Sequence, residues 1–175
     1  KFAIDLLKQT INLNHGIYLE EDIRDGFRTD FCAGVAGYPE KHFECPNMEI
    51  EMQRLKEKVD AGAEYIMTQM FFDNKKYFEF VKQCRSMGID IPIIPGLKPI
   101  TSKKQLSVIP RTFHVDIPTE LNQEIMKAKT DEDCKRVGTE WLIQQSKELK
   151  EFGVPVLHYY TLGSTKVIYN VVKEL

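Results

Sequence analysis

Apolar positions along the chain follow two spacings, one typical of helices and one typical of short buried strands. Three stretches have the spacing of an amphipathic helix: 47–61, 74–87 and 131–152. A glycine follows each stretch, and glycine readily adopts the left-handed conformation with which many helices end. Each glycine leads into a short apolar run: 65–69, 91–95 and 154–159. The chain therefore alternates helix and strand.

A further apolar run, Phe31–Gly37, precedes the first of these helices and predicts a fourth strand. Strands that alternate with helices form a parallel sheet, so the fold class is α/β. The four strands are either a complete open sheet or half of an eight-stranded barrel, which takes roughly 250 residues. The chain has 175 residues and opens inside an amphipathic pattern, Phe2–Ile11. This opening favours the last four strands of a (β/α)8 TIM barrel, with an upstream portion before Lys1.

Two stretches interrupt the alternation within what we interpret as a single domain, residues 1–175. Residues 12–30 are polar and carry a short acidic run, which predicts an exposed insertion. Residues 96–130 contain two short helical patterns, 102–109 and 118–127. Because long connections in compact domains are usually functional, we expect residues 96–130 to cover a substrate.

Composition narrows the classes of partner. The net charge is −2 and no basic run is present, which argues against nucleic acid or an anionic membrane surface. No apolar stretch is long enough to span a bilayer. The four cysteines are scattered without a Cys-x-x-Cys pair, which indicates reduced thiols in a cytoplasmic protein. Metal-ligand spacings and the glycine motif of Rossmann nucleotide sites are absent, so we expect no metal site.

Polar and aromatic side chains follow the predicted strands, where α/β barrels place their chemistry. Tyr38 and His42 flank Pro39 after the first strand and offer a ring for stacking and an imidazole for hydrogen bonding. Gln69 ends the second strand, and its amide donates and accepts toward a heterocycle. The alternative for each of them is an ordinary turn or strand-end residue.

Three charged residues, Glu51, Arg54 and Lys58, share one face of the helix at 47–61. This face predicts a grip on a diphosphate or a ribose through charge-assisted hydrogen bonds. The alternative is a solvated face whose charges neutralise one another. The charge pattern by itself leaves both interpretations open.

Three segments together resemble one enzyme family. They are AGYPEKH (36–42), EKVDAGAEYIMTQMFFD (57–73) and PIIPG (92–96). In this order and spacing they are similar to the flavin-binding barrel of methylenetetrahydrofolate reductases. The resemblance implies a TIM barrel that holds FAD at the carboxyl ends of its strands. NAD(P)H gives a hydride to the flavin, which reduces 5,10-methylenetetrahydrofolate to 5-methyltetrahydrofolate in one-carbon metabolism and methionine biosynthesis.

The resemblance also implies roles for individual residues. Eight are expected to contact the cofactor: Phe2, Ala3, Tyr38, His42, Cys45, Glu51, Arg54 and Lys58. Gln69 is expected to bind the pterin and the nicotinamide, and Gln105 to contact the substrate from the covering segment. The general acid, a glutamate of the family's first strand, is expected upstream of Lys1. No catalytic residue is therefore assigned within the chain.

The sequence departs from the family pattern in several places. Gly163 and Ser164 stand where the family usually has Asn-Arg, whose arginine helps to hold folate, and Lys166 is a candidate substitute. Ile109 lies where some members have an aromatic residue that stacks on the substrate, and Glu51 stands where an aspartate is common. The departure at 163 and 164 puts the binding of the folate tail in question.

Two alternatives to a reductase remain at this point. In the first alternative, the chain as given is an inactive barrel fragment or an interaction module whose strand edges bind a partner. In the second alternative, the chain is part of another pterin-binding barrel protein, such as a folate-dependent methyltransferase, and binds no flavin. For the reductase, we expect a homo-oligomer when complete and no activity from this fragment alone.

Overall fold

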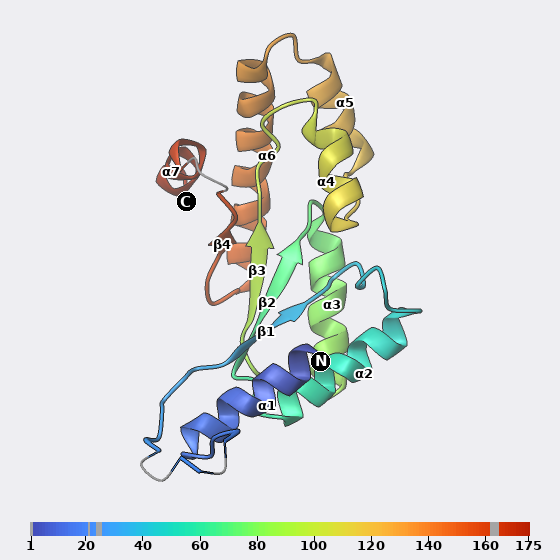
Figure 1. The fold of residues 1–175 in the computed structure, drawn as a ribbon. Coiled ribbons are helices and arrows are strands. Elements are labelled where there is room, and N and C mark those ends of the chain that lie inside the picture. The colour runs from blue at the N-terminus through green and yellow to red at the C-terminus, as the bar shows by residue number, and fades with distance from the viewer. Residues whose placement is uncertain (1, 21, 24–25, 162–164) are drawn as a thin grey trace.

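The computed structural model describes residues 2–20, 22–23, 26–161 and 165–175, and its strands form one parallel sheet in the order β1-β2-β3-β4 (Figure 1). The strands are β1 (Gly34–Gly37), β2 (Tyr65–Met70), β3 (Ile93–Leu97) and β4 (His158–Tyr159). The helices are α1 (Ala3–Asn14), α2 (Met48–Asp60), α3 (Asn74–Ser86), α4 (Gln105–Phe113), α5 (Thr119–Lys127), α6 (Asp131–Phe152) and α7 (Lys166–Lys173). The predicted α/β fold with a parallel sheet is confirmed.

Local capping explains why the three predicted helices lie within one residue of their expected bounds. The side chain of Asn47 accepts a hydrogen bond from the Ile50 amide at the start of α2, over 2.9 Å. Thr130 and Asp133 cap each other at the start of α6. Gly153 ends that helix in the left-handed conformation, at φ 90°. Each cap satisfies backbone groups that a helix end leaves without a partner.

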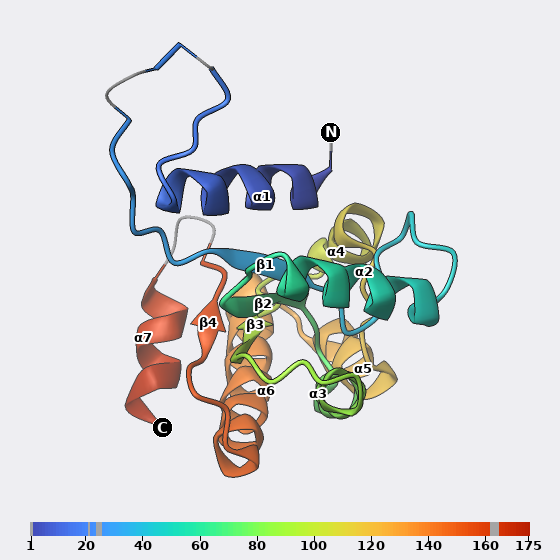
Figure 2. The same ribbon diagram turned by 90° about the horizontal axis from the view of Figure 1, so that it is seen from below.

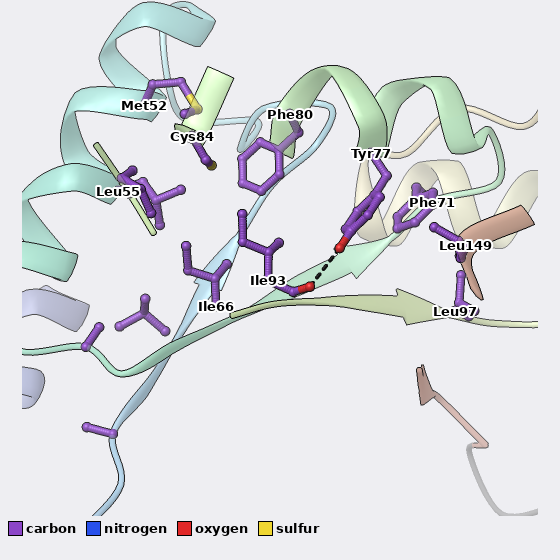
Figure 3. Packing of buried hydrophobic residues seen from close by; sticks show 14 of the residues in the cluster. Met52, Leu55, Ile66, Phe71, Tyr77, Phe80, Cys84, Ile93, Leu97 and Leu149 are labelled. Carbon is purple, nitrogen blue, oxygen red and sulfur yellow. Dashed lines mark hydrogen bonds between the residues drawn. The ribbon is translucent and has the colours of Figure 1, made fainter. Parts of the chain in front are cut away.

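One face of the sheet packs against helices in a hydrophobic core (Figure 3). Ile66 of β2 and Leu97 of β3 are fully buried there, with Phe80 of α3 near Ile66 and Leu149 of α6 near Leu97. Tyr77 is also buried, and its hydroxyl donates to the Ile93 carbonyl oxygen at 2.7 Å. Burial raises the pKa of the Tyr77 phenol, so it stays a neutral donor. The core leaves the other strand face for the site residues.

Three pairs of helices lie at different places around this sheet. Both views place α1 and α2 next to β1, and α6 and α7 next to β3 and β4 (Figure 2). Helices α4 and α5 lie beyond the carboxyl end of β3 (Figure 1). They pack in a second hydrophobic cluster that includes Ile109 and Leu121. That residues 96–130 cover a substrate stays a prediction.

Several predicted bounds were wrong. The first strand covers Gly34–Gly37 rather than 31–37, and the last covers only His158–Tyr159 rather than 154–159. A strand extends only as far as its neighbour pairs with it, and β4 pairs with β3 only at Gly96 and Leu97.

The bounds of two further elements also differ from the prediction, and one helix was not predicted. Strand β3 is Ile93–Leu97 rather than 91–95, and helix α4 runs from Gln105 past Pro110 instead of stopping at residue 109. Helix α7 was not predicted. Residues 12–14 belong to α1, and that residues 12–30 form an insertion stays a prediction. Among the described residues, no helix is both long and apolar enough to cross a bilayer.

Candidate functional site

A cavity of about 610 Å³ lies between α1, β1 and α2. Seven of the eight predicted cofactor contacts line it: Phe2, Ala3, Tyr38, His42, Glu51, Arg54 and Lys58. These residues come from a helix start, a loop and a second helix, which the parallel sheet brings together. The predicted charged face of α2 therefore borders a cavity and not only solvent. Its volume is in the range of small-molecule and cofactor sites.

Lys58 and Glu51 tie α2 to the end of β1. The Lys58 ammonium donates to the Ala36 carbonyl oxygen at 2.9 Å. Glu51 is 4% exposed, and its carboxylate accepts from the His42 amide at 3.2 Å. Burial lowers the pKa of Lys58, while the Glu51 carboxylate opposes that change. Burial, and secondarily Glu51, raises the pKa of Tyr38.

Contacts among its own residues stabilise the loop after β1. Lys41 adopts the left-handed conformation at φ 72°, and its ammonium donates to the carbonyl oxygens of His42 and Cys45. The rings of Tyr38 and His42 meet edge to face, with centroids 4.8 Å apart. Cys45 is buried, its thiol lies 3.4 Å from the Asn47 carbonyl oxygen, and it does not line the cavity. The lining of the cavity therefore does not support the predicted contact between Cys45 and the cofactor.

A second cavity of about 290 Å³ adjoins the first along β1. Its lining includes Gln69 with Tyr65 and Met67, which alternate along the same face of β2. Tyr38 lines both cavities, so Gln69 and the predicted cofactor residues belong to one connected region. The Gln69 amide oxygen accepts from the Met70 amide at 3.0 Å. Its NH₂ group makes no hydrogen bond with the residues that the structure describes.

Tyr160 is a lining residue that the sequence did not single out. Its hydroxyl donates to the Thr68 carbonyl oxygen at 3.0 Å, which holds the ring at the second cavity. Burial, and secondarily Tyr38, raises the pKa of Tyr160. Its position one residue after β4 was the signal, since side chains at strand ends gather at one edge of a parallel sheet.

Gln105 lies outside both cavities. Its amide oxygen accepts from the Thr101 amide at 2.6 Å, so in this structure it stabilises the start of α4. Its predicted contact with the substrate stays a prediction. Ile109 is buried in the second cluster, and Lys166 is exposed in the first turn of α7. The departures at 163 and 164 lie outside the described residues.

The arrangement suits binding more than proton transfer. The two cavities offer stacking rings, an ammonium, a guanidinium, carboxylates and an amide with free donors. In the described part of the chain, no three His, Cys, Asp or Glu side chains come together to hold a metal ion. The fold and these cavities define a parallel α/β protein with a candidate ligand site along the edge strand β1 and the neighbouring helices.

Comparison with known proteins assigns the family. The family model for methylenetetrahydrofolate reductase matches residues 6–175. The probable methylenetetrahydrofolate reductase (NADPH) of Caenorhabditis elegans is 34% identical over 155 residues, 87% of this chain and 23% of that protein. The 5,10-methylenetetrahydrofolate reductase of Escherichia coli is 36% identical over 147 residues, 83% of this chain and 50% of that protein. The chain belongs to the methylenetetrahydrofolate reductase family.

The chain spans half or less of the length of these relatives. A solved Clostridium thermocellum protein, described as binding two copies of 5-methyl-5,6,7,8-tetrahydrofolic acid, superposes with a TM-score of 0.55. The match covers 83% of this chain and 52% of that protein at 19% identity. At this identity the likeness concerns the fold alone.

Proposed function

We propose that this chain is the C-terminal half of the TIM barrel of a flavoprotein that reduces 5,10-methylenetetrahydrofolate to 5-methyltetrahydrofolate, with hydride from NAD(P)H through FAD. The observation that carries the proposal is the shared lining. Seven predicted cofactor residues surround one cavity, and Tyr38 joins it to the cavity that holds Gln69. Membership of the family supports the same reaction.

The residues around the larger cavity have the charges, hydrogen-bonding groups and rings that FAD binding requires. Lys58 and Arg54 supply positive charge for a diphosphate, and the Glu51 carboxylate offers acceptors for ribose hydroxyls. Tyr38 and His42 offer planar faces for stacking. When bound, FAD supplies a ring that accepts a hydride and passes it on.

The chain's own residues bind and orient the cofactor and the substrates. The free NH₂ donors of Gln69 suit the carbonyl and ring-nitrogen acceptors of a pterin or the carboxamide of a nicotinamide. The Lys58 bond to Ala36 holds the cation against the strand before a ligand arrives. Opening the methylene bridge of the folate requires a proton, and we place its donor upstream of Lys1.

The sheet itself supports a larger barrel. In the described part of the chain, β1 pairs only with β2 and β4 only with β3, so each has one edge without a strand partner. The backbone N–H and C=O groups at an unpaired edge can pair with a further strand. In the proposed barrel, the upstream half supplies these strands. The same edges favour the rival in which the isolated chain is an inactive fragment. The complete protein is proposed to be a cytoplasmic homo-oligomer.

A spectrum of the purified full-length protein tests the proposal. We expect flavin absorption bands that bleach anaerobically with NADH or NADPH. We expect their return on addition of 5,10-methylenetetrahydrofolate, with formation of 5-methyltetrahydrofolate. A colourless protein that binds pterin and transfers a methyl group supports the methyltransferase rival and overturns the proposal.

A further inference from the structure

The loop after β1 touches the segment between α4 and α5 through two direct contacts. The ring of Phe43 stacks on His114, with centroids 4.3 Å apart and planes inclined by 23°. The Glu40 carboxylate accepts from the Asp116 amide at 2.6 Å. Glu40 and Phe43 flank His42, which lines the larger cavity, but they do not line it themselves. His114 and Asp116 belong to the predicted covering segment, 96–130. The loop after β1 and the segment between α4 and α5 are thus joined by residues that lie 70 positions or more apart.

The contact continues as a row of rings into the cavity. The centroids of Tyr38 and His42 are 4.8 Å apart, and those of His42 and Phe43 are also 4.8 Å apart. Phe43 then stacks on His114. Since Tyr38 and His42 line the larger cavity, a ligand that orders their rings also acts on Phe43. The row runs from the cavity lining to the covering segment.

Backbone strain lies on both sides of this contact. In the described part of the chain, Lys41 and His114 are the two residues other than glycine with positive φ, at 72° and 54°. Such conformations are unfavourable for residues with a side chain and persist where the surroundings enforce them, often at functional sites. Lys41 is held by its two carbonyl contacts, and the His114 amide donates to the Pro110 carbonyl oxygen at 2.9 Å.

The contact is not part of the hydrophobic core. Phe43 is 56% exposed, and neither Phe43 nor His114 belongs to the two buried clusters. Glu40 loses hydration to accept a single amide proton, and burial raises the pKa of its carboxyl. The contact thus joins two loops outside both buried clusters, which points to a role in placing the covering segment.

We propose that Glu40 and Phe43 are positioning residues that couple the FAD cavity to the covering segment, so that bound flavin favours the placement of residues 96–130 over the folate. The coupling rests on the proposed function. Because binding free energies are reciprocal, bound folate must also tighten the binding of flavin through the same contacts.

The test uses Phe43→Ala and Glu40→Ala in the full-length protein, with Met126→Ala as the control. Met126 is 56% exposed on α5 of the same covering segment. We expect the KM for 5,10-methylenetetrahydrofolate to rise about five- to tenfold in both variants. Reduction of an artificial electron acceptor by NAD(P)H, which needs flavin but no folate, stays unchanged. The increase in flavin affinity that folate causes in the wild-type protein should disappear in both variants.

A double-mutant cycle keeps the test informative if one variant is unstable. Phe43→Ala and His114→Ala remove the same stack from its two sides, so the double variant should raise the KM no further than either single variant. Phe43→Tyr should restore the wild-type value. Variants that match Met126→Ala in KM and in the effect of folate on flavin affinity overturn the coupling, as does an additive cycle. Absence of flavin from the wild-type protein overturns the proposed function itself.

Discussion

Lys58, on α2, donates a hydrogen bond to the carbonyl oxygen of Ala36, at the end of β1, across 2.9 Å. The two residues are 22 positions apart, and the bond sets the lysine's ammonium against the wall of the larger cavity. A cation fixed in this way is ready for an anionic ligand, because little side-chain freedom remains to be lost on binding.

Replacing Lys58 by Met should weaken flavin binding by about tenfold, since a hydrogen bond to a charged group contributes about 1.5 kcal/mol or more. Flavin fluorescence during titration of the apoprotein measures the change. Lys56→Met is the matched control, because Lys56 lies on the same helix and pairs with Asp60. Equal flavin affinity in the two variants removes Lys58 from the site.

Gln69→Ala should impair the reduction of folate while leaving the flavin content unchanged. The expected loss in kcat/KM for 5,10-methylenetetrahydrofolate is about 10- to 100-fold, because the pterin loses hydrogen-bonding partners in a partly buried cavity. Gln144→Ala, on an exposed position of α6, is the control. Steady-state kinetics with both substrates checks the prediction, and unchanged kinetics contradicts the role of Gln69.

Lys98 makes no hydrogen bond or ion pair with the residues that the structure describes, although it is only 7% exposed. Burial lowers its pKa from the ordinary 10.5. We expect Lys98→Met to raise the free energy of unfolding at pH 7 by about 1 kcal/mol, because Met removes a poorly hydrated ammonium that has no partner among the described residues. Urea unfolding measures this change, with Lys75→Met on the exposed start of α3 as the control.

The pH dependence of this difference follows from the direction of the pKa change. Between the lowered pKa and 10.5, the unfolded chain holds more protons on Lys98 than the folded chain does. Stability therefore rises with pH in that window for the wild type. The advantage of Lys98→Met should shrink as the pH rises through the lowered pKa. A constant difference across the alkaline range argues against a perturbed lysine.

Tyr77→Phe should lower the free energy of unfolding by about 1 kcal/mol, because the buried Ile93 carbonyl loses the hydroxyl that donates to it. Tyr18→Phe is the matched control. Its hydroxyl donates to the Phe27 carbonyl oxygen in an exposed part of the chain, where water replaces it. Denaturant titrations of both variants should show a loss for Tyr77 alone.

The site was only partly foreseeable from the sequence. Glu51, Arg54 and Lys58 share a helix face by local geometry, so their grouping was predicted correctly, and the structure adds that the face borders a cavity. Tyr160 was missed and Cys45 was placed in a loop without knowledge of its burial. Which side chains of a loop enter a cavity depends on segments that are distant in the chain.

The sequence alone determined the helices α2, α3 and α6, because periodicity and caps such as Asn47 and Thr130 act within a few residues. The alternation of helices and strands also determined that the strands are parallel. Only the tertiary structure decided how short β4 is, where Lys58 meets Ala36, and that Phe43 stacks on His114. Those contacts join residues up to 71 positions apart. Their formation depends on how packed elements meet in space, and no local pattern in the chain encodes that.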